Sequence, residues 1–418
     1  MGADGLVSCG EQKGSALMRP LPRTVWMLGL VSLLMDFSSE LIHGLLPIYL
    51  TVTLGVSVAA LGLIEGVAEA TAAIVKVFSG TLSDAWGRRK PLLLLGYGLA
   101  ALTKPLFPLA GGAALVFTAR FLDRIGKGIR GAPRDALVAD VTPAAQRGAA
   151  FGLRQSMDTV GAVIGPLVAM ALLAGVFGAA TDVRGALWFA VIPAILAWLV
   201  LLVAVREPET QVGREAGAAA ATKRPGLRRE DLRKFAAGYW VVVALGAVFT
   251  LARFSEAFLV LRVSGFDASP LWGPAAIATM SIVYALLSYP AGLLADRVDA
   301  RGLLAAGLIV LLGADVVLAF ATSPWIALAG VALWGLHLGL TQGVLSALVA
   351  GTAPAHLRGS AFGVFNLVSG VMLLIASVLA GALWEHVSPI ATFVAGGVLC
   401  CIALAGLLGV KPLRPGKE

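Results

Sequence analysis

The chain has 418 residues, of which 58% are hydrophobic and only 13% are charged, and its mean hydropathy is +0.89. This composition excludes a soluble globular protein, because the polar side chains are too few to cover a surface in contact with water. The formal net charge of +8 comes mainly from cations at the ends of apolar segments, so we expect a lipid bilayer around the chain and no nucleic-acid partner.

Apolar segments long enough to cross a membrane follow one another along the chain. A spanning helix needs about 20 residues. The segments are continuously apolar, without the period-two alternation of lipid-facing strands, which favours helices over a β-barrel. We predict an all-α integral membrane protein with twelve spans, in the segments 24–50, 57–82, 91–111, 113–134, 148–174, 185–205, 236–262, 271–294, 302–321, 324–348, 359–381 and 389–410.

Three ionisable side chains share one face of the first predicted span. Asp36, Glu40 and His43 stand at i, i+4 and i+7, and Asp36 lies about 18 Å into the membrane by helical rise. A charge at that depth costs about 3 kcal/mol on insertion scales, so it indicates a cavity or a partner. We predict that Asp36 and Glu40 take part in proton coupling and that His43 contacts the substrate.

Carboxylates and imidazole on one helical face are also possible metal ligands. With His337 in the tenth span as a second imidazole, export of a divalent metal stays open as a less favoured alternative. We predict no resident metal and no cofactor.

The second predicted span carries Glu65 and Glu69 on one face. We predict that both contact the substrate; alternatively, they lie at the extracellular mouth as solvated carboxylates without a function. The end of this span and the loop after it contain a compact pattern of glycine and charge, made of Gly80, Asp84, Gly87, Arg88 and Arg89.

The fourth and fifth predicted spans add further charges inside the membrane. Arg120 and Asp123 lie deep in the fourth span. The string from Arg120 to Pro133 resembles the Arg-Phe-Leu-x-Gly-x-Gly stretch of the major facilitator superfamily, in which an intramembrane arginine is linked to proton movement, and this resemblance implies that Arg120 and Asp123 take part in proton coupling. Farther along the same span, we expect long basic side chains to extend toward the cytoplasmic interface, at Lys127, Arg130 and Arg134. In the fifth span, Arg154 and Asp158 stand at i, i+4 and are predicted to contact the substrate.

The fifth span also contains Gly152, Gly161, Gly165 and Pro166. Glycines allow a neighbouring helix to approach closely, and a proline frees a backbone carbonyl and bends the helix. We predict that this motif forms a close helix contact; whether it does more than pack helices is left open.

Two sequence patterns occur twice at nearly the same offset. Residues 142–152 return as 353–363, 211 positions later, and 80–91 returns in weaker form as 292–302, which aligns Asp84 with Asp296. Two matches at one offset indicate two homologous halves. We predict a tail at 1–23, a six-helix bundle at 24–205, a charged, alanine-rich linker at 206–234, a second six-helix bundle at 235–410 and a tail at 411–418.

The cations indicate how the chain is oriented. They gather in both tails and in the even-numbered connections, so the positive-inside rule places both termini on the cytoplasmic side of the inner (plasma) membrane. Residues 1–23 lack the apolar core of a signal peptide, so we expect the first span to direct insertion.

The seventh predicted span carries Arg253 and Glu256 at i, i+3. Its Phe254 and the following serine align with a Phe-Ser pair in the first span, which makes Arg253 the counterpart of Asp36. We predict a ring of Asp36, Glu40, Arg253 and Glu256 around an amphipathic or zwitterionic solute. The alternative is that Asp36 or Glu40 is permanently paired with Arg120 or Arg154 and fixes helix packing.

Six plus six spans, a charged central linker and the loop from Gly80 to Arg89 resemble the major facilitator superfamily of secondary transporters. In that family the loop acts as a cytoplasmic latch. The resemblance implies that Asp84 and Arg88 help to hold the inward-closed state, in which the Asp84 carboxylate caps the positive N-terminal end of the eleventh span. Asp296 and Arg297 form the second copy of this latch. The alternative is that these charges anchor a tight turn.

The glycines of the fifth span resemble the motif of drug:proton antiporters in this superfamily, although Ala169 and Met170 stand where that motif has glycines. The resemblance favours a monomeric, proton-coupled exporter of a small organic solute; uptake by proton symport is the alternative. An enzyme is not expected, because no nucleophile with its base, no zinc-protease motif and no pair of catalytic carboxylates stands out in the apolar spans. No nucleotide-binding loop is evident either, so we do not expect ATP to be the energy source.

Overall fold

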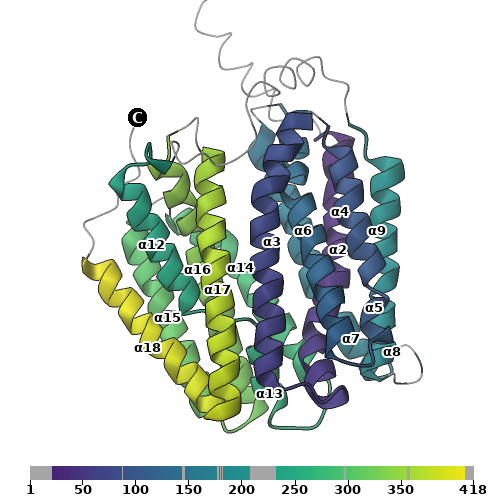
Figure 1. The fold of residues 1–418 in the computed structure, drawn as a ribbon, viewed down its shortest axis with the longest axis vertical. Coiled ribbons are helices and arrows are strands. Elements are labelled where there is room, and N and C mark those ends of the chain that lie inside the picture. Colours follow the sequence, from purple (N-terminus) through teal and green to yellow (C-terminus); the bar gives the residue numbers. More distant parts are fainter. Residues whose placement is uncertain are drawn as a thin grey trace, which may run out of the picture.

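The computed structural model describes residues 21–86, 88–143, 146–176, 178, 180, 182–207, 232–295, 298–354 and 358–409. All regular secondary structure among these residues is helical (Figure 1). The predicted all-α fold class is therefore confirmed for the part of the chain that is described.

The first half of the chain forms long helices joined by short connections. A lysine-proline pair separates α4 from α5, and the carboxylate of Asp182 accepts a hydrogen bond of 2.7 Å from the backbone N–H of Gly185 at the start of α8. The elements are α2 (Arg23–Ile48), the π-helix η1 (Tyr49–Thr53), α3 (Val58–Trp86), α4 (Lys90–Thr103), α5 (Leu106–Leu109), α6 (Ala113–Val141), α7 (Arg147–Leu173), α8 (Val183–Phe189) and α9 (Val191–Ala204).

The second half contains a broken helix followed by five continuous ones. The break lies at 252–256, and Arg253 and Glu256 are both in it. The elements are α12 (Ala237–Leu251), α13 (Ala257–Ser264), α14 (Trp272–Ala295), α15 (Ala300–Phe320), α16 (Pro324–Thr352), α17 (Arg358–His386) and α18 (Pro389–Gly409).

Nine helical segments of the described chain are long and apolar enough to cross a membrane. The three other predicted spans also contain helices, but each of these helices is too charged or too short to count as a membrane span by length and hydropathy. Helix α6 carries eight charged side chains, the segment at 236–262 is divided between α12 and α13, and the apolar described part of α14 is the shorter stretch Trp272–Ser288.

Helices α2 to α9 lie on one side of the molecule and α12 to α18 on the other (Figure 1). We call the end where α2 begins and α9 ends the upper end, as it is drawn, and the end with α8 and α13 the lower end. Small residues bring the two sides together along α3 and α17. A methyl group at Gly66 would lie 2.9 Å from the side chain of Leu374, and one at Gly370 would lie 2.7 Å from that of Ala73.

The two sides of the molecule contact each other at the lower end. The backbone N–H of Ala59 donates a hydrogen bond of 2.8 Å to the Glu385 carboxylate. Gly44 of α2 packs on α14, where a methyl group would lie 2.9 Å from the Cα atom of Pro274. The two sides of the molecule are therefore joined at this end.

Candidate functional site

Ionisable side chains from five helices of the first half gather around α6. Along α6, four cations follow at spacings of four, three and seven residues, which places them on one face. Carboxylates of α2, α3 and α7 surround this face. We call the whole group the charged cluster; it consists of Asp36, Glu40, His43, Glu65, Glu69, Lys104, Arg120, Asp123, Arg124, Lys127, Arg134, Asp135, Arg154, Asp158 and, from the other half, Glu256.

Arg120 of α6 and Glu65 of α3 form a fully buried ion pair in this cluster. The Arg120 Nε and Nη2 atoms donate to the two Glu65 oxygens at 2.9 and 2.7 Å, and both side chains are 2% exposed. Such a bidentate pair is strong and directional. The alternative pairing of Arg120 with Asp36 or Glu40 is wrong, and so is the view of Glu65 as a solvated carboxylate.

Asp123 has a partner that sequence reasoning missed. The Lys104 ammonium, fully buried at the end of α4, donates to the Asp123 carboxylate at 2.9 Å and to the Ser39 hydroxyl at 3.1 Å. This one cation therefore links α2, α4 and α6. The available signal was a lone lysine inside the apolar segment at 91–111, directly before a proline.

Glu69 also has a cation beside it. The Arg124 guanidinium lies 3.1 Å from the Glu69 carboxylate, whose side chain is 28% exposed. Glu69 is thus an ion-paired group on a partly accessible face. Its expected contact with the substrate stays a prediction.

The upper part of the cluster is a network across α2, α6 and α7. Arg154 lies 3.0 Å from the Asp158 carboxylate and 3.7 Å from Asp135, so its expected pairing with Asp36 or Glu40 is also wrong. Arg134 donates to the hydroxyl of Ser32 at 3.0 Å and lies 3.5 Å from Asp158.

These contacts correct the expectation for Arg130 and Arg134, whereas Lys127 is exposed and the expectation for it stays a prediction. Arg134 is held between α2 and α7, and the Arg130 guanidinium is buried 4.8 Å from the centre of the Tyr97 ring. Neither side chain extends toward the membrane surface. Stacking on an aromatic ring and ion pairing replace the predicted contact with the interface.

Asp36 differs from the other carboxylates of the cluster. Among the described residues it forms no hydrogen bond and no ion pair, and its side chain is only partly buried. The charged side chains that act most strongly on the Asp36 carboxylate are Asp158, Lys127, Glu40 and Arg134. A carboxylate with two cations near it and no direct partner is available to a proton or to a solute.

His43 connects the two halves. Its Nδ1 atom lies 3.2 Å from a Glu40 oxygen and 3.8 Å from a Glu256 oxygen. These contacts bring together two members of the predicted ring, Glu40 and Glu256, and the ring of four itself stays a prediction. Glu40 and Glu256 both lie beside His43, whereas Arg253 and Asp36 form no ion pair within the described part of the chain.

The predicted latch is only partly described. Gly80 and Asp84 lie in the last turns of α3, and Arg88 is exposed. Arg89 donates to the Ser83 hydroxyl at 2.6 Å and to the Asp140 carboxylate at 3.4 Å, both in the first half, and its backbone N–H donates to Glu207 at the start of the predicted linker. Gly87, Asp296 and Arg297 lie outside the described residues.

The glycine motif of α7 lies mainly against α2. A methyl group at Gly161 would lie 3.1 Å from the Cα atom of Leu33, and one at Gly165 would lie 2.9 Å from the backbone nitrogen of Leu41. Gly152 faces open space, so the motif does not act as one contact. Pro166 lies inside the helix, directly after Gly165.

Metal-ligating side chains do not converge in the described ranges. No group of three or more histidine, cysteine or acidic residues there has the geometry to hold an ion. His337 is buried in α16, with its Nδ1 atom 2.8 Å from the carbonyl oxygen of Gly307. It does not join the imidazole of His43.

Sequence comparison provides the family. The model of the Major Facilitator Superfamily matches residues 28–280 and 264–418. The chain belongs to the major facilitator superfamily. It is therefore a membrane transporter, and its relatives within the superfamily bear this out.

Two relatives differ in how much of the chain they share. An uncharacterised transporter of the superfamily from Methanocaldococcus jannaschii is 31% identical over 409 residues, which are 95% of this chain and 96% of the relative. The quinolone resistance protein NorA of Staphylococcus aureus is 26% identical over 169 residues, 40% of this chain and 42% of that protein.

Solved structures support the same fold. A POT family transporter, crystallised in complex with a thioalcohol-conjugated peptide, matches with a TM-score of 0.73 at 14% identity, and the match covers 93% of this chain and 96% of that transporter. At this identity the likeness shows the fold and carries no information on the substrate.

Proposed function

We propose that this superfamily member exports a small organic solute across the inner membrane in exchange for protons, by alternating access of its two halves. In this proposal the upper end is cytoplasmic, and twelve spans form two six-helix bundles at 24–205 and 235–410, joined by the linker at 206–234. The transporter works as a monomer, uses the proton gradient and needs no cofactor.

Asp36 carries the proposal. Every other carboxylate of the charged cluster has a cation or an imidazole within 4.0 Å, whereas Asp36 has no direct partner among the described residues. A group that binds and releases protons during a cycle must be free to change its charge, and a carboxylate locked in a buried pair is not. We assign proton exchange to Asp36, with Glu40 beside it.

The paired residues then have a different role. Arg120 with Glu65 and Asp123 with Lys104 hold α3, α4 and α6 in register. We therefore propose that Arg120 and Asp123 support proton coupling without carrying the proton.

His43 supplies the connection to the second half. It lies between Glu40 of α2 and Glu256 at the start of α13, so a proton or a charged solute at this point acts on both halves at once. Side chains of both signs are accessible here, which suits an amphipathic or zwitterionic solute. We propose that this solute contacts His43, Glu69, Arg253 and Glu256, with Arg154 and Asp158 above them.

Export is favoured over uptake by two likenesses. One is the motif of Gly161, Gly165 and Pro166, which resembles that of drug:proton antiporters. The other is the partial similarity to a quinolone resistance protein. Both point to efflux of organic molecules.

The test is transport by the full chain in proteoliposomes with an imposed pH gradient, screened against antibiotics, organic acids, amino acids and divalent metals. We expect Asp36→Asn to bind the identified solute but to lose uphill transport and the accompanying proton movement. Asp299→Asn, an exposed acid before α15, is the matched control and should behave like the unmodified chain. Full proton-coupled transport by Asp36→Asn would disprove the assignment.

A further inference from the structure

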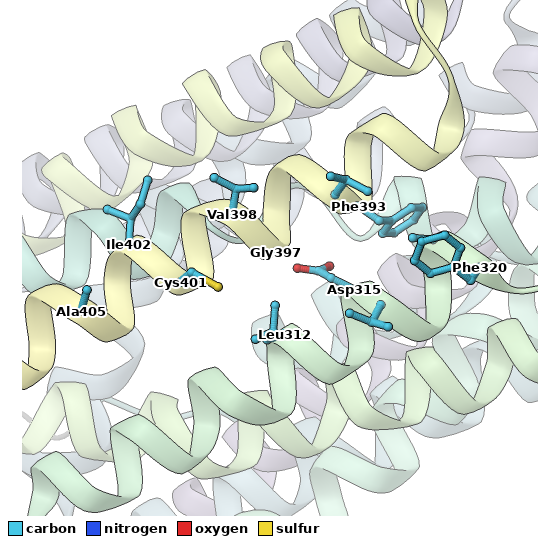
Figure 2. Close-up of a pocket in the computed structure, with 12 residues that line it drawn as sticks. Leu312, Asp315, Phe320, Phe393, Gly397, Val398, Cys401, Ile402 and Ala405 are labelled. Atoms are coloured by element: carbon cyan, nitrogen blue, oxygen red, sulfur yellow. The ribbon is translucent and has the colours of Figure 1, made fainter.

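A cavity of about 520 Å³ lies between α15 and α18, away from the charged cluster (Figure 2). Its walls are almost entirely apolar and include Leu312, Phe320, Phe393, Val398 and Ile402. Helices α15 and α18 pack mainly on each other and on α12, α16 and α17, whereas the main contacts with the first half come from α13, α14 and α17. The cavity is therefore on the outer face of the second half, where the membrane surrounds the protein.

One carboxylate interrupts this apolar wall. Asp315 of α15 is 1% exposed, and its Oδ1 atom is buried without a hydrogen-bond partner. Its Oδ2 atom lies 4.0 Å from the Cys400 thiol, which is a weak donor. Figure 2 shows the carboxylate directed from α15 toward α18, near Gly397 and Phe393.

The sequence of α18 leaves room for this group. A methyl group at Gly396 would lie 2.8 Å from the Asp315 carboxylate, so the glycine is what allows the acid to face α18. No cation of the described residues forms an ion pair with Asp315. Arg262, at the same end of α15, donates instead to the carbonyl oxygens of Leu318, Ala319 and Ala321 at 2.7 to 3.0 Å.

The acid is close enough to the membrane boundary to meet an amphipathic molecule. It stands five residues before the end of α15, or about 8 Å by helical rise. Phe320 at that end is 68% exposed. A buried polar group without a partner is costly, so a ligand that supplies a charged donor gains more here than in water.

We propose that this outer pocket binds a lipophilic ammonium compound from the membrane, with the cation on Asp315 and the apolar body between α15 and α18. The unpaired carboxylate selects a cation, and the cavity has the volume of typical small-molecule sites, about 300–1,000 Å³. Because the pocket is separate from the charged cluster, the inference does not rest on the proposed transport cycle.

The test measures binding of tritiated chlorpromazine, a tertiary ammonium with an aromatic body, to the full chain in nanodiscs of pure phosphatidylcholine. We expect saturable binding of one molecule per chain. Asp315→Asn should weaken it about tenfold or more, as expected for loss of a charge-assisted hydrogen bond. Equal affinity of Asp315→Asn and the unmodified chain would overturn the proposal.

A second pair of variants tests the pocket without touching the acid. Val398→Trp fills the cavity from α18 and should abolish binding, whereas Ile309→Trp is the matched control, because Val398 and Ile309 are 55% and 57% exposed and only Val398 lines the cavity. Unchanged binding by Val398→Trp would contradict the proposed location. Loss of binding in Asp36→Asn but not in Asp315→Asn would place the ligand in the charged cluster instead.

The remaining arm distinguishes the free amine from a lipid. Nanodiscs that also contain phosphatidylethanolamine present a primary ammonium on a lipid headgroup. We expect chlorpromazine to bind there as well. Complete loss of its binding in these nanodiscs would overturn the choice of occupant in favour of the lipid.

Discussion

At the scale of single residues, the structure shows which partner most of the charged side chains inside the membrane helices have. Helical spacing alone places Asp36, Glu40 and His43 on one face, and this was predicted from the sequence. The partners of Arg120 and Arg154 were not predictable, because several carboxylates lie at similar depth and only the rotation and height of the neighbouring helices choose between them. Lys104 and Asp315 were missed for a related reason: each is a lone charge in an apolar run and belongs to no periodic pattern.

The pair of Arg120 and Glu65 gives a prediction for stability. Glu65→Gln leaves a buried guanidinium without its counter-charge, so we expect a loss of about 3–5 kcal/mol. The double variant Glu65→Leu/Arg120→Met removes both charges and should be less destabilised than the single variant. Thermal unfolding in detergent measures both, with Asp299→Asn as a control on an exposed acid.

The stability of the double variant shows whether the loss in Glu65→Gln comes from the unpaired guanidinium. A lower melting temperature for the double variant than for Glu65→Gln would mean that the pair contributes net stability. Our account of it as a buried charge that needs its partner would then be wrong.

At the scale of elements, two helix features position the site. The glycines of α7 let it lie directly on the backbone of α2, which holds the face of Asp36 and Glu40 close to Asp158. The break between α12 and α13 interrupts the helix at Arg253 and Glu256, and Glu256 lies 3.8 Å from His43 of α2. The sequence predicted the first feature; for the second it showed the charges at Arg253 and Glu256, but we read the segment 236–262 as one continuous span.

The contact of α7 with α2 predicts a sharp difference between two glycines. Gly165→Val places two methyl groups against the backbone at Leu41, so overpacking should cost about 1–3 kcal/mol. Gly152→Ala meets open space and should change stability by less than about 1 kcal/mol. Melting temperatures of the two purified variants provide the measurement, and equal effects would exclude the close contact seen at Gly165.

At the scale of the whole molecule, the internal repeat and the apolar segments predicted the all-helical fold and the family. Counting spans was less certain, because α6 is too charged and the segment at 236–262 is broken. The joint at the lower end was not predictable, since Ala59 and Glu385 are far apart in the sequence and neither belongs to a motif.

Because the two halves are in contact at the lower end, we predict that transport requires these contacts to separate. Ser57 and Glu385 are exposed, and Glu385 accepts a hydrogen bond across the two halves from the backbone N–H of Ala59, two residues after Ser57. In a background without the three native cysteines, Ser57→Cys/Glu385→Cys should stop transport when a short thiol-cleavable linker joins the two positions, and a reductant should restore it. Each single-cysteine variant serves as the control.

An unchanged transport rate in the fully cross-linked protein would show that the lower end does not separate during the cycle. The alternating-access proposal would then fail at its central step.

The eight charges of α6 also bear on how the protein is made. A helix with this many ionisable side chains is a poor candidate for entering lipid alone, yet its main counter-charges, Glu65, Glu69 and Lys104, belong to helices that are synthesised before it. The earlier helices can therefore wait at the translocon and receive α6 as it emerges, so that the ion pairs form during biogenesis. The order of the spans along the chain would then be part of what allows the site to be built.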